Sequence, residues 1–343
     1  MICDDSLVIR GAIARILEAD PGIQVVARVG NGRAAVEEIG RTPVDVVVLD
    51  IEMPILDGMA ALPLLLRADP GVRVIMASTL TTRGADIALR ALRLGAADYV
   101  PKPSSIGSRS NDSFRQELVA KVKGLARQRR GGASTASGAG KLAARPAPAL
   151  PPRLLAIGSS TGGPQALFTL FQGLGRTVNV PVVITQHMPP TFTPILAEHI
   201  TRLGQMPCAE AKDGEPLLPN RAYLAPGDRH LVIEGNRSGL RSRLTSDPPE
   251  NFCRPAVDPM LRSAASACEG RVLVTILTGM GHDGLAGTRR VIDGGGCAIG
   301  QDEASSVVWG MPSAIAQGGL CHAVLPLPKI APKLLELLKG ARP

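Results

Sequence analysis

Apolar and polar positions alternate with two different periods along the first part of the chain. Residues 6–18 carry apolar side chains at helical spacing behind Ser6, a residue type that favours helix N-caps. Residues 44–50 are nearly continuously apolar, which is typical of a strand buried on both faces of a parallel sheet. Further strands are predicted at residues 23–29, 72–77 and 97–100, and further helices at residues 33–39, 58–67, 83–94 and 114–122. This order predicts a doubly wound α/β domain.

The same alternation returns after residue 152. Strands are predicted at residues 153–158, 181–186, 271–277, 297–301 and 323–325. Residues 217–244 are more polar and contain the turn signals Pro-Gly-Asp and Glu-Gly-Asn, which indicates a hairpin. The expected fold class is therefore α/β, with two doubly wound domains that each contain a mainly parallel sheet.

A segment of different composition separates the two patterns. Residues 131–140 are rich in Gly, Ser and Ala, and the stretch up to residue 152 is rich in Pro and Ala, so neither can supply a core. Eight Lys and Arg residues and no acid lie from residue 118 to residue 153, and they equal the whole net charge of +8. Because this charge is local and aromatic residues make up only 2%, nucleic-acid binding is not expected. We predict domains at residues 1–125 and 153–343, joined by a flexible basic linker at residues 126–152.

The sequence also disfavours several classes of protein. No apolar run reaches the roughly 18–20 residues that a membrane-spanning helix needs, and Asp4 and Asp5 stand where a signal peptide would carry basic residues. The six cysteines include no Cys-x-x-Cys pair, which disfavours a zinc site or a disulfide framework. We therefore expect a cytoplasmic protein with free thiols and no membrane insertion.

Acidic residues fall at the ends of predicted strands in the first domain. Asp4 and Asp5 follow the first strand and Asp50 ends the third, and ligands of open parallel sheets bind at these carboxyl ends. Clustered carboxylates repel one another and so favour a Mg²⁺ ion, which takes oxygen ligands. Ser78 and Lys102 follow two further strands and would offer a hydroxyl and a cation to phosphoryl oxygens. The set predicts a site at which Asp50 is phosphorylated.

These residues resemble the receiver domain of two-component response regulators. The matching motifs are Asp-Asp, Leu-Asp-Ile-Glu-Met-Pro, Ser-Thr and Tyr-Val-Pro-Lys-Pro, and the resemblance covers residues 1–125. It implies a flavodoxin-like fold and phosphorylation of Asp50 by a histidine kinase. It also implies a role for each of the other residues: Mg²⁺ held by Asp4, Asp5, Asp50 and the carbonyl of Glu52, and a conformational switch that involves Ser78, Tyr99 and Lys102.

The start of the chain departs from the receiver pattern. Only residues 1–3 precede Asp4, whereas receivers begin with a complete central strand, and typical strands have roughly five to six residues. Either the true start lies upstream of Met1, or the central strand is short and the domain is weakened. We favour the first alternative.

A second candidate site begins where residues 153–158 run into Gly-Ser-Ser-Thr-Gly-Gly-Pro-Gln. Ser160 is the centre of a Gly-x-Ser-x-Gly arrangement at a predicted strand-to-helix turn, although such a turn by itself suits a phosphate-binding loop equally well. A nucleophilic serine needs a base and an orienting carboxylate, and His187 and Asp283 follow two other predicted strands. The sequence therefore predicts a Ser-His-Asp triad at one sheet edge. Among the other histidines, we expect His199 at the surface, no special role for His322, and His230 as a candidate to line the cleft.

The second domain closely resembles the chemotaxis protein-glutamate methylesterases. The matching segments are Ile-Gly-Ser-Ser-Thr-Gly-Gly-Pro, Ile-Thr-Gln-His-Met-Pro-Pro, Tyr-Leu-Ala-Pro-Gly-Asp-Arg-His, Ile-Leu-Thr-Gly-Met-Gly-His-Asp-Gly and Ser-Ser-Val-Val-Trp-Gly-Met-Pro. The resemblance implies a Rossmann-like domain in which Ser160 is the nucleophile, His187 the base and Asp283 the orienting acid. It further implies that the Met280 N–H donates to the oxyanion and that Thr161 lines the site. The family commonly has Asn where this chain has His282.

The resemblance also implies what the whole protein does. A receiver joined to such a domain hydrolyses glutamate γ-methyl esters on chemoreceptors and releases methanol, with no cofactor for the hydrolysis, and some relatives deamidate receptor glutamine. In the family, the unphosphorylated receiver packs over the catalytic cleft, and phosphorylation loosens that packing. Two alternatives stay open: a second domain that only binds, with an inactive triad, and an esterase that serves a non-chemotactic receptor pathway.

Overall fold

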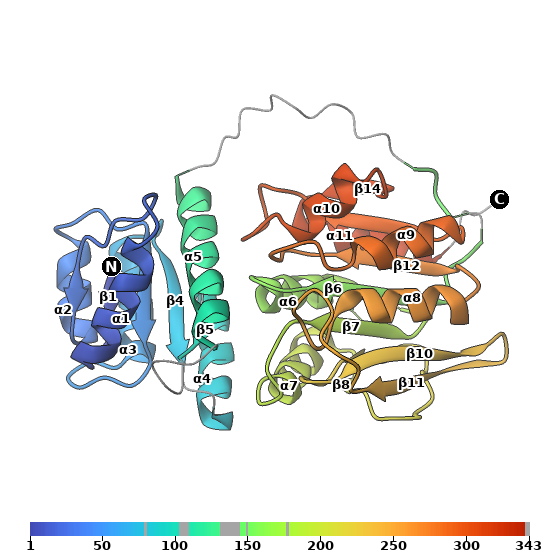
Figure 1. Ribbon diagram of the computed structural model, residues 1–343, viewed down its shortest axis with the longest axis horizontal. Coiled ribbons are helices and arrows are strands. Elements are labelled where there is room, and N and C mark those ends of the chain that lie inside the picture. The colour runs from blue at the N-terminus through green and yellow to red at the C-terminus, as the bar shows by residue number, and fades with distance from the viewer. Residues whose placement is uncertain (79–80, 103–109, 131–144, 149, 176–177, 340–343) are drawn as a thin grey trace. The chain divides into compact units, whose positions relative to one another are not determined.

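The computed structural model describes the chain except for residues 79–80, 103–109, 131–144, 149, 176–177 and 340–343, and it gives the backbone alone for residues 110–113 and 128. The chain forms two compact units, Met1–Ser134 and Thr135–Pro343. In each unit, helices pack against a central sheet (Figure 1).

The first unit contains a five-stranded parallel sheet. Its strands are β1 (Ile2–Cys3), β2 (Arg28–Val29), β3 (Val46–Asp50), β4 (Arg73–Ser78) and β5 (Asp98–Pro101). Its helices are α1 (Leu7–Glu18), α2 (Gly32–Ile39), α3 (Gly58–Ala68), α4 (Thr82–Arg93) and α5 (Ser110–Arg129). The strand order β2-β1-β3-β4-β5 confirms the prediction of a doubly wound α/β fold.

Local signals in the sequence account for the main elements of this unit. The Ser6 hydroxyl caps α1, since it accepts a hydrogen bond from the Ile9 N–H at 3.4 Å. All five residues of β3 are buried, as the continuous apolar run predicted. The side chains of Asn31 and Asp57 cap α2 and α3 in the same way as Ser6 caps α1. Helix capping and strand burial therefore agree with the elements predicted from the sequence along most of this unit.

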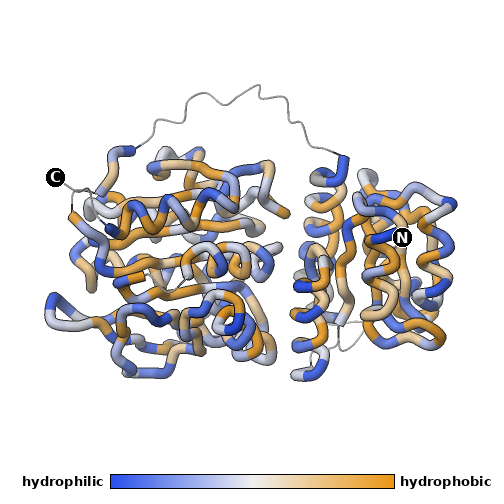
Figure 2. The backbone as a smooth tube through the Cα atoms, turned by 180° about the vertical axis from the view of Figure 1, so that it is seen from behind, coloured by the Kyte–Doolittle hydropathy of each residue, from blue (hydrophilic) through white to orange (hydrophobic). Residues whose placement is uncertain are grey.

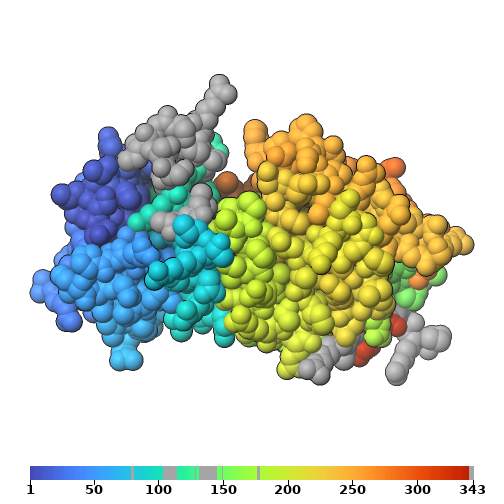
Figure 3. Space-filling view, turned by 90° about the horizontal axis from the view of Figure 1, so that it is seen from below, coloured from blue at the N-terminus to red at the C-terminus, as the bar shows by residue number. Residues whose placement is uncertain are grey.

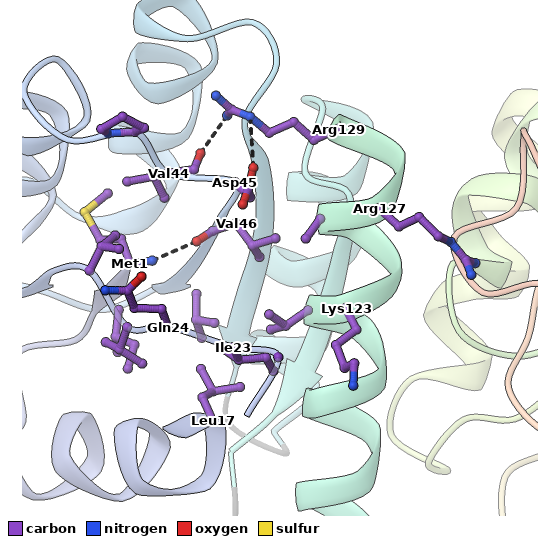
Figure 4. A pocket seen from close by; sticks show the side chains of 18 of the residues that line it. Met1, Leu17, Ile23, Gln24, Val44, Asp45, Val46, Lys123, Arg127 and Arg129 are labelled. Atoms are coloured by element: carbon purple, nitrogen blue, oxygen red, sulfur yellow. Dashed lines mark hydrogen bonds and ion pairs between the residues drawn. The ribbon is translucent and has the colours of Figure 1, made fainter. Parts of the chain in front are cut away.

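The sheet is short beside β1. Strands β1 and β2 have two residues each, so the prediction of a strand at residues 23–29 holds only for its last two residues. A cavity of about 810 Å³ lies at the amino end of β3, where the Met1 ammonium donates to the Val46 carbonyl at 2.9 Å (Figure 4). Because Asp50 ends β3, the cavity and the acidic residues lie at opposite edges of the sheet. The cavity is lined, among others, by Leu17, Ile23, Val44, Lys123, Arg127 and Arg129.

Helix α5 corrects the predicted domain boundary. It continues to Arg129, whereas the linker was predicted to begin at residue 126. Arg129 forms an ion pair with Asp69 at 2.7 Å, and Arg130 forms one with Asp45 at 2.6 Å. These ion pairs tie the basic end of α5 to the first unit, because both acids belong to that unit. Of the linker predicted at residues 126–152, residues 131–144 and 149 lie outside the described residues.

The second unit contains a seven-stranded sheet and a separate hairpin. The sheet strands are β6 (Leu154–Ser159), β7 (Val182–Gln186), β8 (Cys208–Glu210), β9 (Ala222–Leu224), β12 (Val272–Ile276), β13 (Cys297–Gln301) and β14 (Ala323–Leu325), and the hairpin consists of β10 (His230–Asn236) and β11 (Gly239–Thr245). The helices are α6 (Gly163–Leu174), α7 (Thr193–Gly204), α8 (Val257–Ala267), α9 (Leu285–Asp293), α10 (Met311–Gln317) and α11 (Leu327–Leu338). The sheet is parallel throughout, in the order β14-β13-β12-β6-β7-β9-β8.

The predicted strands of this unit are confirmed, with one correction in the polar middle. The hairpin expected at residues 217–244 is present as β10 and β11, but β9 lies within the same range and joins the parallel sheet beside β7. Strand β8 was not predicted. Both β8 and β9 have three residues, which is too short for a hydrophobic period to identify. The chain from α7 to β11, drawn in yellow-green to yellow, forms much of the face of this unit in Figure 3.

The strand order of the second unit places three buried strands, and therefore their carboxyl ends, side by side. Strands β6, β7, β12 and β13 are buried along their whole length. In Figure 2 the interior of each unit is largely hydrophobic, and the helices carry hydrophobic positions as well. Strand β6 lies between β12 and β7, so the carboxyl ends of these three strands are neighbours at one edge of the sheet.

Among the described helices, none has the length and apolar character that crossing a membrane requires.

Candidate active site and acidic cluster

The three predicted triad residues come from neighbouring positions at that sheet edge. Ser160 directly follows β6 and His187 directly follows β7, and the preceding residues, Ser159 and Gln186, are partners in the strand register. Asp283 belongs to the loop that connects β12 to α9. Parallel pairing alone therefore brings the nucleophile and the base next to each other, and the loop after β12 adds the acid.

Glycines allow the tight turn that presents Ser160. The Ser160 N–H donates to the Thr278 carbonyl at 3.0 Å, and the Gly163 N–H donates to the Ser160 carbonyl at 2.7 Å. Gly162 has a φ of 74°, in the left-handed region, and a Cβ at Gly163 would lie 1.9 Å from Gln186 Oε1. The turn between β6 and α6 therefore requires glycine at both positions.

Gln186 fixes the backbone of both the nucleophile and the base. Its Oε1 accepts a hydrogen bond from the Ser159 hydroxyl at 2.7 Å. Its Nε2 donates to the carbonyls of Ser160 and His187, at 2.9 Å and 3.1 Å. Sequence reasoning missed this role, because a Gln at the last position of an apolar strand is the only signal that the sequence carries.

His187 and Asp283 form a buried pair. His187 Nε2 lies 2.7 Å from Asp283 Oδ2, and the two side chains are 12% and 2% exposed. The Val257 and Asp258 N–H groups at the start of α8 also donate to Asp283, at 2.6 Å and 3.0 Å. A helix N-terminus favours negative charge. Burial alone would raise the pKa of Asp283, but these contacts outweigh burial and lower the pKa.

The other ring nitrogen of His187 contacts a cysteine. Nδ1 lies 3.3 Å from Cys253 Sγ. Burial alone would lower the pKa of His187, but the contacts with Asp283 and Cys253 raise it to about 10. Within the described residues, no hydrogen bond joins the Ser160 hydroxyl to His187. The structure thus forms the His-Asp link of the predicted triad and leaves the Ser-His link open, as is common before substrate binds.

Two backbone N–H groups beside Ser160 are available to an oxyanion. In the part of the chain that the structure describes, the N–H groups of Thr161 and Met280 have no hydrogen-bond acceptor. Thr161 directly follows the nucleophile, which is the usual position of one oxyanion donor. Gly279, which precedes Met280, packs so closely that a Cβ there would lie 2.9 Å from Ser160 Cβ. Both sequence-predicted residues, Thr161 and Met280, therefore lie at the nucleophile.

The remaining histidines correct two expectations. His199 is buried, at 1% exposure, and its ring stacks on Phe168 with centroids 6.0 Å apart, so the expectation of a surface residue was wrong. His230 is also buried. It accepts a hydrogen bond from the Ala256 N–H at 3.1 Å, and its other ring nitrogen lies 3.1 Å from the Pro248 carbonyl, so it holds the entry to α8 and does not line the cleft. His282, beside the predicted acid, is exposed.

The acidic residues of the first unit form a cluster at the carboxyl ends of β1 and β3. Asp4, Asp5 and Asp50 each offer a carboxylate oxygen, and the three oxygens lie within 4.8 Å of one another. The Lys102 ammonium lies 2.8 Å from Asp4 Oδ2 and 2.7 Å from Asp50 Oδ1. Burial raises the pKa of Asp50, and Lys102 opposes that shift. Burial would lower the pKa of Lys102, but Asp4 and Asp50 together raise it.

Most of the predicted switch residues line one cavity. A cavity of about 310 Å³ lies over the cluster, lined among others by Asp5, Asp50, Glu52, Ser78 and Lys102. Tyr99, on β5, is not among the lining residues of this cavity. Its side chain is buried, and the Lys121 ammonium lies 5.0 Å from its ring centroid. Carboxylates within reach of one another suit Mg²⁺, which takes oxygen ligands in an octahedral arrangement. The donor set therefore fits that ion, with Lys102 as a nearby counter-charge.

Comparisons with known proteins agree with this division into two sites. Residues 155–334 match the family model described as CheB methylesterase, and residues 1–108 match the response regulator receiver domain. A protein-glutamate methylesterase/protein-glutamine glutaminase 1 of Paramagnetospirillum magneticum is 53% identical, over 98% of this chain and 95% of its own length. A relative of the same activity from Rhodospirillum centenum, of its group 2 operon, is 55% identical over 98% of this chain and 93% of its own. The CheB methylesterase catalytic domain of Thermotoga maritima superposes with a TM-score of 0.53 and 39% identity, over 55% of this chain and all of that one.

Proposed function

This chain belongs to the CheB methylesterase family, and we propose that its second unit hydrolyses glutamate γ-methyl esters on chemoreceptors through Ser160, under the control of phosphorylation at Asp50. The observation that carries the proposal is the meeting of Ser160, the His187–Asp283 pair and two acceptor-free N–H groups at one sheet edge. An ester carbonyl placed there has a nucleophile, a base and oxyanion donors around it.

The contacts of His187 support a separate task for each of its ring nitrogens. Asp283 accepts from Nε2, so Nδ1 is the nitrogen that takes the proton when Ser160 Oγ attacks the ester carbonyl. The N–H groups of Thr161 and Met280 receive the oxyanion of the tetrahedral intermediate. Its collapse breaks the bond to the methoxy oxygen, which takes the proton back from Nδ1 and leaves as methanol. Water then cleaves the acyl-enzyme by the same sequence of proton transfers and releases the glutamate carboxylate.

The same site suits deamidation of receptor glutamine. Attack on a side-chain amide gives the same acyl-enzyme, with ammonia as the leaving group instead of methanol. Names of relatives that combine methylesterase and glutaminase activity support this second reaction. Neither reaction requires a cofactor at Ser160.

Control of the enzyme is proposed to begin at the acidic cluster of the first unit. A histidine kinase of the chemotaxis pathway is the proposed phosphodonor, and Asp50 is the acceptor. Asp4, Asp5, Asp50 and the Glu52 carbonyl would hold Mg²⁺, which neutralises phosphoryl charge when bound. Lys102 and Ser78 would contact the phosphoryl oxygens, and Tyr99 would transmit the conformational change to the rest of the unit.

The six free cysteines support a reducing, cytoplasmic setting.

Methanol release from a methylated chemoreceptor tests the proposal. The native chain should release methanol, a small-molecule phosphodonor should increase the rate, and Ser160→Ala should lower the rate on the order of 10⁶-fold. Asp50→Asn should keep the basal rate and lose the response to the phosphodonor. Full activity of Ser160→Ala would contradict the assigned nucleophile, and a phosphodonor response in Asp50→Asn would contradict the assigned acceptor.

A further inference from the structure

A two-residue turn approaches the catalytic pair from outside the sheet edge. The backbones of Glu250 and Cys253 exchange two hydrogen bonds, at 3.1 Å and 2.9 Å. The two residues between them, Asn251 and Phe252, have φ values of 52° and 63°, which residues other than glycine rarely adopt. A bulky residue in this conformation is an outlier that points to a function held in place by its surroundings.

The turn contacts both members of the catalytic pair. Asn251 Nδ2 donates to Asp283 Oδ1 at 2.9 Å and to Asp258 Oδ2 at 3.0 Å. Cys253 Sγ lies 3.3 Å from His187 Nδ1. Phe252, between these two residues, points away from the protein and is fully exposed. The left-handed backbone thus turns the polar side chains of Asn251 and Cys253 inward, on either side of the outward Phe252.

Cys253 and Ser160 need the same atom. Asp283 occupies Nε2, so Nδ1 is the only ring nitrogen left for the Ser160 proton. In the structure Nδ1 contacts the thiol, and within the described residues the Ser160 hydroxyl makes no hydrogen bond to the ring. One nitrogen cannot serve both partners at once.

We propose that Cys253 is a positioning residue that occupies Nδ1 of His187 in the resting enzyme, so that catalysis requires Nδ1 to exchange the thiol for the Ser160 hydroxyl. This inference rests on the proposed roles of Ser160 and His187. In this resting form Nδ1 carries a proton and donates it to the thiol sulfur, so Ser160 is not activated. The ring must lose this proton to solvent before Nδ1 can accept from the Ser160 hydroxyl.

The surroundings favour this role over a nucleophilic one for Cys253. The acceptor-free N–H groups of Thr161 and Met280 lie beside Ser160, whereas the Cys253 N–H is bonded to the Glu250 carbonyl. An intermediate formed on Cys253 would therefore lack its own backbone N–H as an oxyanion donor. The thiol has the base but not the oxyanion site.

The charged groups around His187 define what a titration should detect. Asp283 and Cys253 face the ring directly, and behind Asp283 lie Asp258 on α8 and the ion pair of Arg262 with Glu250 at 2.5 Å. Cys253 is one of the causes that raise the pKa of His187. A contact that raises this pKa is one in which the protonated Nδ1–H donates to Sγ. Removal of the thiol leaves the acids unchanged, so it should lower the pKa of His187 and make an unprotonated Nδ1 available to Ser160.

The test compares Cys253→Ala and Cys253→Ser with the native full-length chain, using kcat/KM for methanol release from methylated receptor as a function of pH. In Cys253→Ala the acidic limb should move to lower pH by roughly one unit, which raises kcat/KM below the limb about tenfold. The change should lie in kcat and leave KM nearly constant. Cys253→Ser keeps a hydroxyl near Nδ1 and should fall between the two. Cys208→Ala, on the edge strand β8, is the matched control and should keep the native profile.

A second measurement does not depend on turnover. The pKa of His187, followed by NMR in Ser160→Ala and in Ser160→Ala with Cys253→Ala, should fall when the thiol is removed. An unchanged titration, or an unchanged acidic limb in folded Cys253→Ala, overturns the inference. Loss of activity in folded Cys253→Ala and Cys253→Ser overturns it as well, because the thiol would then be required. Activity that survives in Ser160→Ala would instead refute the proposed function itself.

Discussion

The side chain of Asp283 is almost completely buried, yet its pKa is lowered. Its two oxygens accept hydrogen bonds from His187, from Asn251 and from three backbone N–H groups, those of Val257, Asp258 and Gly284. A carboxylate with this many donors keeps a lowered pKa despite burial. It therefore holds the proton of His187 on Nε2 and leaves Nδ1 for Ser160.

Asp283→Asn should remove this control of the tautomer. The amide can donate to Nε2, which moves the ring proton to Nδ1, the atom that must accept from Ser160. We expect kcat for methanol release to fall on the order of 10⁴-fold while the unit stays folded. The exposed neighbour provides the control: within the described residues the His282 side chain makes no hydrogen bond or ion pair, so His282→Asn should leave kcat nearly native. A kcat for Asp283→Asn within tenfold of native would contradict the assigned role.

Gln186→Leu tests the backbone clamp that joins the nucleophile and the base. The change removes the partner of the Ser159 hydroxyl and of the Ser160 and His187 carbonyls, and it leaves them in a buried place. The free energy of unfolding should fall by about 1–3 kcal/mol, and kcat should fall with it. Urea unfolding followed by the fluorescence of Trp309, the single Trp of the chain, measures this. Gln172→Leu, an exposed change on α6, should leave both quantities near native.

Among elements, α5 carries a charged residue into the core of the first unit. Lys121 is 2% exposed and pairs with Asp98 at 3.3 Å and Glu117 at 2.8 Å, and it also donates to the Tyr99 carbonyl. Burial raises the pKa of Asp98, and Lys121 opposes this effect. The helix is thus tied to β5, the strand that carries Tyr99, through a buried ion pair.

Lys121→Met should leave Asp98 buried without its cation. Breaking a buried pair from one side typically costs about 3–5 kcal/mol, and we expect a loss of this size in the stability of the first unit. The measurement is the urea transition seen by circular dichroism but not by Trp309 fluorescence, which reports the second unit. Glu117→Gln removes the more exposed partner and should cost less. Equal losses for both variants would show that Asp98 is not the partner that matters.

The sequence predicted long, continuous elements better than short ones. The apolar runs that became β3, β6 and β13 identify themselves, because burial on both faces leaves no polar side chain before the last residue of each strand. Strands β8 and β9 and the buried His199 depend on contacts between distant segments, which no local period records. Cys253 and Gln186 were missed for the same reason: their roles arise only when the strand ends meet. That Ser160, His187 and Asp283 lie near one another was predictable because strand ends of a parallel sheet share one edge.

At the scale of the whole molecule, both sites follow one topological rule. In the first sheet, the chain passes from β1 to β2 on one side and places β3 on the other; in the second, it passes from β6 to β7 and places β12 on the other. Ligands of doubly wound sheets bind at such switch points, where neighbouring loops diverge. Asp4, Asp5 and Asp50 lie at the first switch point, and Ser160 and Asp283 lie at the second. Two unrelated chemistries thus use the same feature of backbone topology.

The His187–Asp283 pair should make the stability of the second unit depend on pH in a defined direction. Because the folded-state pKa of His187 is raised, the pair's contribution is complete below the unfolded pKa of about 6.5 and is lost as pH rises through the folded value of about 10. The pKa of Asp283 is lowered, so its contribution is present above about pH 3.9 and is lost as pH falls through the folded value. The stabilisation by the pair should therefore be largest between about pH 4 and 6.5.

His187→Gln isolates the alkaline side of this dependence. The variant keeps a hydrogen-bonding side chain but cannot take a proton, so the native chain should be more stable at pH 6, and this advantage should shrink by at least about 1 kcal/mol by pH 10. Urea unfolding followed by Trp309 fluorescence at several pH values measures the difference. His322→Gln is the matched control. In the native chain, Nδ1 of His322 contacts the Arg145 carbonyl, which is distant in sequence from the site, so this variant should show no comparable trend with pH. The difference in unfolding free energy between the native chain and His187→Gln could instead stay constant across this pH range. His187 would then carry no extra proton in the folded state, and in the resting contact the Cys253 thiol would donate to a neutral ring.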